Sequence, residues 1–203
     1  MKALKYAFVC FTLLITPLPT SGHELAVDLT KNAVPITASF VGSELMLYGA
    51  SESSGDILVV VRGPNKDQTV RRKKKSALIW VNDMEVTFLN APSYYFLAST
   101  RPLDDFLSND TAKIEKIGYS ALDLKVKGIV DDDEIIEDFQ NALIRNKQKQ
   151  GLYGQGPGLV SYKGKHLFRT RLKFPANVPV GNYNIDIYDF KNGKIINKES
   201  TVL

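Results

Sequence analysis

The sequence is poor in the residues that most often bind metals or form covalent intermediates, with one cysteine, two histidines and three methionines among 203 residues. The cysteine, Cys10, lies in an apolar run near the N-terminus, from Tyr6 to Leu18. Without that run the chain has no cysteine, which excludes a disulfide, a thiolate metal site and a cysteine nucleophile. Stability must then come from a packed core, and about 180 residues are ample for one such domain.

The N-terminus has the order of features that is typical of an export signal. Lys2 and Lys5 precede the apolar run, and the small residues of "PTSG" follow it. The run is shorter than the roughly 20 residues that span a bilayer, so we predict a signal peptide over residues 1–22, cleaved before His23. An uncleaved anchor is the alternative, because prolines and a glycine at the boundary make an imperfect processing site. Cleavage predicts an exported, periplasmic chain with a single domain over residues 23–203.

Hydrophobic patterning over residues 25–100 predicts a series of short strands separated by turns. A continuous apolar run over residues 56–63 is typical of a central strand that is buried on both faces. The other predicted strands are residues 36–40, residues 44–50, and the segments "QTVRRKKK", "SALIWVN", "EVTFL" and "SYYFLAS". Strands that recur about every ten residues, with turn signals between them, indicate a β-sandwich.

The pattern changes at Pro102, where we predict a helical insertion over residues 102–151. A short helix is expected around residues 103–117, with Gly118 as its stop. The clearest element is a helix in "DDDEIIEDFQNALIRNKQKQG", which has Ile136, Phe139 and Leu143 on one face at helical spacing. Its acidic start, its basic end and the glycine that follows all agree with the helix dipole and with a left-handed cap.

Strands return after the insertion. A hairpin is predicted to turn at Lys163-Gly164, and its second arm alternates apolar and cationic residues, which gives it one apolar and one cationic face. Asn192-Gly193 predicts a two-residue hairpin near the end of the chain. Tyr183 follows a loop rich in proline and glycine, as does the corner tyrosine of immunoglobulin-like sandwiches, whose hydroxyl bonds back to the backbone; an ordinary half-buried tyrosine is the alternative. We therefore predict a mainly β protein, an immunoglobulin-like β-sandwich with a helical insertion.

Several blocks of the sequence resemble a known family. "GDILVVVRGP", "VRRK", "IWVN", "ALIRNKQKQGLY", "LFRTRLKFPANVPVGNY" and "ELMLYGA" together are similar to the alphaproteobacterial putative transmembrane family, a group of exported proteins without assigned activity. The resemblance covers the chain from about Leu25 to its end. It implies an exported domain, usually followed by one C-terminal membrane helix, and association with an inner-membrane permease that resembles sulfite exporters. This sequence ends at "STVL" without the apolar tail that the family leads us to expect.

Five consecutive cations form the most conspicuous charge feature: Arg71, Arg72, Lys73, Lys74 and Lys75. Basic runs of this kind often bind nucleic acid or direct nuclear import. A chain that follows an export signal meets neither, so we expect no nucleic-acid partner. Burying such a run without counter-charges is too costly, so we predict that it lies on an edge strand or a projecting hairpin, where lysines also block aggregation. Contact with an anionic membrane surface, or with an acidic patch of a membrane partner, is the functional alternative. Arg169 and Arg171 form a second, weaker candidate contact.

Catalytic and metal-binding patterns are scarce. His166 would have to serve any Ser/His/Asp triad, yet the sequence has no G-x-S-x-G elbow, and we expect His166 to be structural. His23 at a new N-terminus could bind copper(II), but few other ligands accompany it. The acidic residues 131–134 lack the spacing of a calcium loop and are better explained as a helix cap. We predict no cofactor, no metal site and no catalytic residue.

Two functions follow from these observations. The first is a non-enzymatic periplasmic interaction module, associated with the inner membrane and accessory to a transporter. The alternative is a periplasmic hydrolase that uses carboxylates brought together by the fold.

Overall fold

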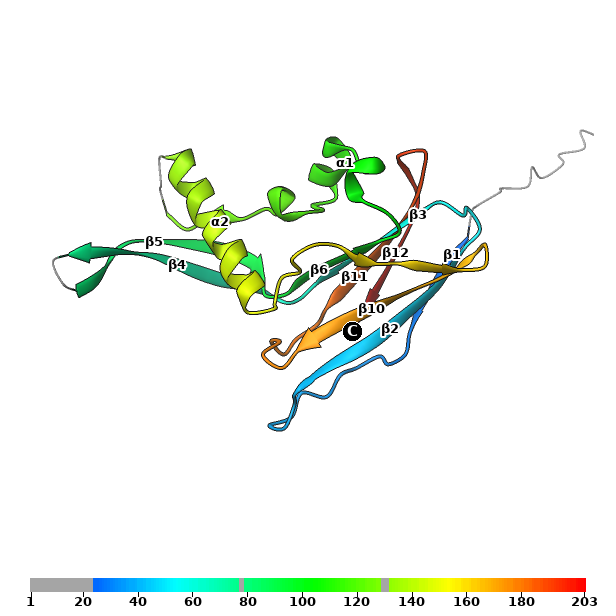
Figure 1. The fold of residues 1–203 in the computed structure, drawn as a ribbon, viewed down its shortest axis with the longest axis horizontal. Coiled ribbons are helices and arrows are strands. Elements are labelled where there is room, and N and C mark those ends of the chain that lie inside the picture. The colour runs from blue at the N-terminus through cyan, green and yellow to red at the C-terminus, as the bar shows by residue number, and fades with distance from the viewer. Residues whose placement is uncertain (1–23, 77–78, 129–131) are drawn as a thin grey trace, which may run out of the picture.

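The computed structural model describes residues 24–76, 79–128 and 132–203, so the predicted signal peptide, its cleavage site, Cys10, His23 and Asp131 lie outside the described residues. The protein is mainly β, with three sheets and two α-helices in its described part (Figure 1). None of the helices in these ranges is long and apolar enough to cross a bilayer.

Two sheets form the body of the molecule. Sheet A is antiparallel and contains, in spatial order, β1 (Leu25–Leu29), β2 (Gly42–Ser51), β10 (Leu167–Pro175) and β9 (Ser161–Lys163). Sheet B contains β12 (Lys194–Val202), β11 (Asn184–Lys191), β3 (Asp56–Arg62), β6 (Tyr95–Ser99) and β8 (Gly158–Leu159), with only β8 parallel to its neighbour. The chain passes from sheet B to sheet A between β8 and β9, which closes one side of the body.

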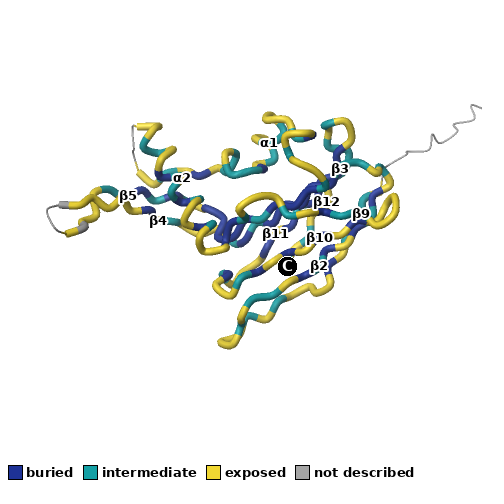
Figure 2. The backbone as a smooth tube through the Cα atoms, in the orientation of Figure 1, coloured by how far each residue is buried: buried dark blue, intermediate teal, exposed yellow. Residues whose placement is uncertain are grey.

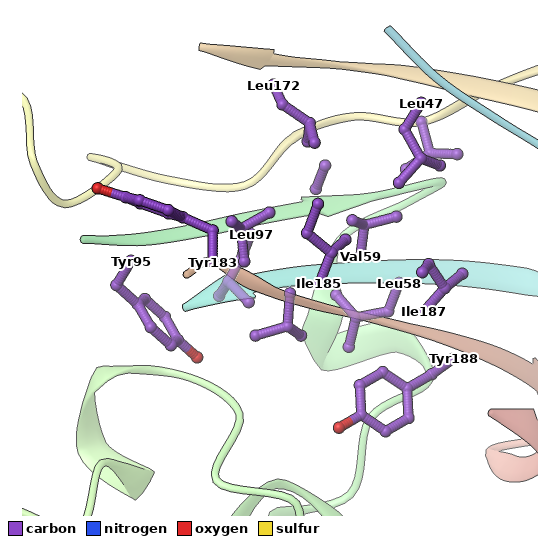
Figure 3. Packing of buried hydrophobic residues seen from close by; sticks show 14 of the residues in the cluster. Leu47, Leu58, Val59, Tyr95, Leu97, Leu172, Tyr183, Ile185, Ile187 and Tyr188 are labelled. Carbon is purple, nitrogen blue, oxygen red and sulfur yellow. The ribbon is translucent and has the colours of Figure 1, made fainter. Parts of the chain in front are cut away.

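Both sheets contribute to one hydrophobic core. Figure 3 shows Leu47 and Leu172 of sheet A facing Val59, Ile185 and Ile187 of sheet B, and all five side chains are buried. Residues 57–61 of β3 are buried throughout, because one face of this strand meets sheet A and the other meets the insertion. β3 also lies at the centre of sheet B, so the prediction of a central strand buried on both faces is confirmed.

The third sheet, sheet C, projects from this body. It contains β4 (Asn65–Ser76), β5 (Ile79–Pro92) and the short β7 (Lys125–Val126), with β4 at its edge. The helix α2 (Asp133–Lys149) packs on it. We call sheet C together with α2 the arm, and Figure 2 shows that its residues become exposed toward its end.

The insertion between β6 and β8 is only partly helical. It comprises the 3-10 turns η1 (Leu103–Asp105) and η2 (Tyr119–Ala121), the helix α1 (Asn109–Ile114), β7 and α2. The single helix expected around residues 103–117 is wrong, because Ser108 caps a new helix there by accepting a hydrogen bond from the amide of Thr111. Gly118 is not the stop of this helix: α1 ends at Ile114, Lys116 is the left-handed residue after it with a φ of 54°, and Gly118 precedes η2.

The prediction for α2 is confirmed, since Asp132 caps its N-terminus by accepting bonds from the amides of Glu134 and Ile135. Gly151 follows the helix with a φ of 72°, as the left-handed cap requires. Phe139 and Leu143 are buried on the face that the periodicity predicted.

Two strand predictions are wrong. Residues 36–40 form no strand, because Pro35 offers no amide hydrogen and the amide of Phe40 turns back to the carbonyl of Thr37. The sequence predicts separate strands in "SALIWVN" and "EVTFL", but residues 79–82 of the first and all of the second belong to one strand, β5. This strand pairs with β4 and accommodates a register shift between Arg72 and Lys73.

The predicted turns after the insertion are confirmed. Gly164 begins the turn between β9 and β10, and the burial of β10 alternates strictly along the strand. Asn192 and Gly193 join β11 to β12 with φ values of 53° and 76°, the pair of positive angles that a type I′ hairpin needs. Tyr183 is buried, and its hydroxyl donates a hydrogen bond to the carbonyl of Pro179.

Candidate interaction surface

The base of the arm has a small hydrophobic core of its own. Val70 of β4, Val86 and Phe88 of β5, and Phe139 and Leu143 of α2 are all buried in it. This second core is distinct from the cluster between sheets A and B, and it holds α2 across the hairpin. The arm is therefore a supported projection and not an isolated two-stranded ribbon, which would be marginally stable in water.

The five-cation run lies on β4, at the edge of sheet C and on a projecting hairpin, as the sequence predicted (Figure 1). Its first two members are neutralised across the hairpin: Arg71 donates to Glu85 at 2.8 Å, and Arg72 donates to Asp83 at 3.0 Å. The guanidinium of Arg72 also lies 5.9 Å from the ring centroid of Phe139. These two arginines therefore contribute to the structure of the arm.

The remaining three cations, Lys73, Lys74 and Lys75, are exposed and make no ion pair or hydrogen bond with any side chain that the structure describes. On β5, Val81 lies opposite Lys74 and Ile79 lies opposite Ser76, and these two apolar side chains are 38% and 65% exposed. We call the three lysines together with Ile79 and Val81 the arm tip. The arm tip therefore combines three cations with two exposed apolar side chains.

A small pocket of about 340 Å³ opens where β4 meets α2. Arg71, Arg72 and Arg145 line it together with a single carboxylate, Asp138. Arg71 and Arg72 are paired with Glu85 and Asp83, and the two remaining charges of the lining, Arg145 and Asp138, are of opposite sign, so the pocket adds no net charge to the arm.

Arg169 and Arg171 lie on a different surface, the outer face of sheet A. They alternate with the buried Phe168, Thr170 and Leu172 along β10, as predicted. Both arginines line a pocket of about 400 Å³. The structure therefore separates the two sets of candidate contact residues onto two sheets, and does not join them into one site.

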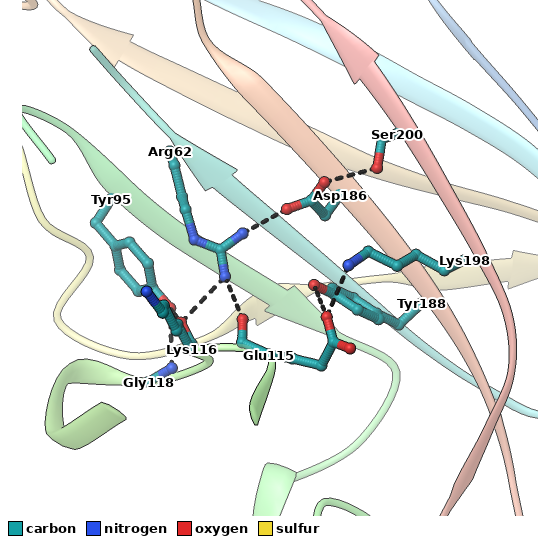
Figure 4. Close-up of polar contacts among 9 residues, drawn as sticks. All are labelled: Arg62, Tyr95, Glu115, Lys116, Gly118, Asp186, Tyr188, Lys198 and Ser200. Carbon is teal, nitrogen blue, oxygen red and sulfur yellow. Dashed lines mark hydrogen bonds and ion pairs between the residues drawn. The ribbon is translucent and has the colours of Figure 1, made fainter. Parts of the chain in front are cut away.

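A polar network fastens the insertion to the outer face of sheet B (Figure 4). Arg62 of β3 pairs with Asp186 of β11 and also donates to the backbone carbonyls of Glu115 and Lys116. The Glu115 carboxylate accepts hydrogen bonds from Tyr188 and from Lys198. The Lys198 bond, followed by the Tyr188 bond, lowers the pKa of Glu115, although burial opposes the shift.

The residues of this network were not identified from the sequence. Residues that contact each other in the network lie far apart in the sequence, by 124 positions for Arg62 and Asp186, and no local pattern marks them. The charged groups of the network contact one another and the backbone, so the network attaches the insertion to sheet B.

His166 is exposed, and its Nδ1 lies 3.1 Å from the carbonyl oxygen of Ser51. The nearby buried carboxylate, Asp189, accepts hydrogen bonds from the hydroxyls of Ser51 and Ser53. No hydrogen bond or ion pair of the described residues joins His166 to Asp189, and none of the five pockets described is lined by His166. In residues 24–76, 79–128 and 132–203, no three His, Cys, Asp or Glu side chains are grouped as a metal site requires.

Comparison with protein families matches residues 24–203 to the family described as "Putative transmembrane protein (Alph_Pro_TM)". The chain belongs to this family. The resemblance expected from the sequence is thereby confirmed. No curated protein and no solved structure matches the chain.

The Alph_Pro_TM match extends over the arm as well as the two-sheet body. It includes both sets of candidate contact residues, the arm tip on β4 and β5 and the arginines on β10. Because the family description carries no activity, the surface chemistry described above must carry the functional argument.

Proposed function

We propose that this protein is a non-enzymatic interaction module that is exported to the periplasm and works at the inner membrane as an accessory to a transport protein. The single observation that carries the proposal is the arm, a supported projection whose end presents three lysines without counter-charges beside exposed Ile79 and Val81. Such a surface is suited to binding and offers no set of groups for covalent chemistry. The description of the family as "Putative transmembrane protein" supports a place at the membrane.

We also propose that the body is an immunoglobulin-like sandwich. Two observations support this: sheets A and B share one core, and Tyr183 bonds back to the carbonyl of Pro179 in the manner of a tyrosine corner. Modules of this architecture commonly present loops and hairpins to partners while the body stays rigid.

Export is tested by the mass of the chain recovered from the native host. A cleaved signal gives a mature chain that begins at His23, whereas an anchored chain retains residues 1–22. Recovery of the full-length chain from the cytoplasm would overturn the proposal.

The partner is tested by photo-crosslinking in the native host. A crosslinkable amino acid replaces Lys74 on the arm tip in one strain and Lys191, an exposed residue at the β11–β12 turn, in a control strain. We expect one inner-membrane protein to be recovered by mass spectrometry from the Lys74 strain and not from the control. Equal recovery from both positions, or no membrane protein from either, would remove the arm as the contact surface.

A further inference from the structure

The charge of the arm is concentrated at its end. Arg71 and Arg72 are paired with Glu85 and Asp83, so the pairs contribute no net charge. The three lysines that follow are exposed and have no acidic partner in the part of the chain that the structure describes. The end of the arm therefore carries a local positive charge, and it projects from a body in which cations and anions are nearly equal in number.

Apolar side chains share this end with the lysines. Val81 lies opposite Lys74 and Ile79 lies opposite Ser76, so Lys74, Val81 and Ile79 occupy one face of the hairpin. The same face carries Val70 and Val86 nearer the body, where α2 covers them. Beyond the cover of α2 the apolar face continues into solvent, and Figure 2 shows this end of the arm as exposed.

The lysines also point in more than one direction. Along a strand, successive side chains alternate between faces, so Lys73 and Lys75 project on the side opposite to Lys74. The tip therefore presents positive charge on both faces of the hairpin, and a headgroup layer that surrounds the end of the hairpin contacts both faces.

We propose that the arm tip inserts into the headgroup region of an anionic phospholipid bilayer, with Ile79 and Val81 reaching the acyl boundary and Lys73, Lys74 and Lys75 contacting lipid phosphates. Anionic lipid attracts cations near its surface, and the same interface accepts apolar side chains. The inference rests on the proposed function, because the chain meets the periplasmic face of the inner membrane if it is exported and associated with that membrane.

The test is binding of the full chain to vesicles, measured by co-sedimentation. Vesicles of phosphatidylcholine that contain phosphatidylglycerol are compared with vesicles of phosphatidylcholine alone. All variants keep residues 1–22, so that any binding by this segment is the same in each. We expect binding that needs phosphatidylglycerol and weakens as salt is added, since screening reduces contacts between exposed charges.

Two triple variants separate the tip from general charge. The tip variant is K73Q/K74Q/K75Q, and the matched control is K163Q/K165Q/K191Q, which removes the same charge from exposed positions on the body. At about 1 kcal/mol for each lysine, the tip variant should bind roughly 100-fold more weakly, while the control keeps most of the affinity. The double variant I79S/V81S removes the apolar contact and should bind about tenfold more weakly than the natural sequence.

Equal effects of the two triple variants, or undiminished binding by the tip variant, would overturn the proposal. All substituted side chains are exposed or half-buried, and unchanged far-ultraviolet circular dichroism verifies that the variants are folded. The crosslinking experiment is repeated with the tip variant. If a membrane protein is recovered but the natural sequence does not bind vesicles, the lipid inference fails and the interaction module stands. If vesicles are bound through the tip but no membrane protein is recovered, the lipid contact stands and the protein partner is removed.

Discussion

Arg62 and Asp186 form an ion pair on the outer face of sheet B, with 2.5 Å between Nη1 and Oδ2. The two residues lie on adjacent strands and are both mostly buried, and the same guanidinium holds two backbone carbonyls of the insertion. One side chain therefore joins two strands of the body to the segment that leads toward the arm. Its loss would remove the donor to the Glu115 carbonyl and would leave Asp186 with Ser200, and the Lys116 carbonyl with Tyr95, as their remaining side-chain donors.

Replacing Arg62 with methionine should lower the free energy of unfolding by about 1.5–3 kcal/mol, because hydrogen bonds to charged groups are worth about that much. Urea denaturation measures the change. Lys198→Met is the control: it removes the exposed partner of Glu115 and should cost less than about 1 kcal/mol. An equal loss in the two variants would show that the insertion is not fastened by Arg62.

Tyr183→Phe removes only the hydroxyl that donates to the carbonyl of Pro179. We expect a loss of about 1 kcal/mol in unfolding free energy, the usual contribution of one hydrogen bond. Tyr48→Phe, at an exposed tyrosine of sheet A, should change stability by less than about 0.5 kcal/mol. If Tyr183→Phe is as stable as the natural sequence, the corner bond does not contribute to the fold.

One buried and two half-buried tyrosines predict loss of stability in alkali. Burial raises the pKa of Tyr119, Tyr162 and Tyr183 to about 12, above the usual value near 10. The folded state therefore retains protons that the unfolded state releases. The resulting stabilisation is complete below pH 10 and is lost as the pH rises from about 10 to 12. Tyrosinate absorbance is followed together with unfolding, and the signal of Tyr183 is taken as the difference between the natural sequence and Tyr183→Phe. We expect this difference to appear only as the protein unfolds; its reversible appearance near pH 10 in the folded protein would contradict the prediction.

Phe139→Ala should unfold the arm without unfolding the body, because Phe139 belongs to the small core under α2 and not to the core between sheets A and B. A buried phenylalanine costs about 3–5 kcal/mol when truncated. Hydrogen exchange should therefore lose protection in α2, β4 and β5, while β3 and β11 keep theirs. Leu47→Ala, in the main core, should instead lower protection throughout both sheets. Global loss in the Phe139 variant would mean that the two cores form one cooperative unit.

Lys147 on α2 is buried, and its pKa is lowered, first by burial and then by the nearby charge of Lys66. The folded state therefore disfavours the charged lysine at neutral pH. Lys147→Met keeps the side-chain volume and removes this penalty, so it should raise the free energy of unfolding by about 1 kcal/mol or less. Lys149→Met, on the exposed end of the helix, is the control. A destabilised Lys147 variant would show that its ammonium group has a stabilising contact.

The elements that sequence reasoning placed correctly are those that local interactions define. Asn192-Gly193 specifies its turn through two adjacent residues, and α2 is set by Asp132, Gly151 and its apolar face. The strand predicted for residues 36–40 is wrong. The segment is apolar and β-branched, as strands often are, but Pro35 and the turn at Phe40 remove amides that strand pairing requires. β5 was predicted as two strands, but Asp83, which lies between the two predicted segments, pairs with Arg72 of β4, and the strand is continuous through this position.

The sequence alone determined the mainly β architecture, the position of α2 and the placement of the basic run on an exposed hairpin, since periodicity, caps and the cost of burying charge act within a few residues. The tertiary structure decided which of those cations are free. Arg71 and Arg72 are neutralised because the hairpin register brings Glu85 and Asp83 to them, and α2 returns from the insertion to cover only the base of the arm. Charge pairing across strands depends on register and on distant segments, so no window of sequence could separate the structural arginines from the exposed lysines.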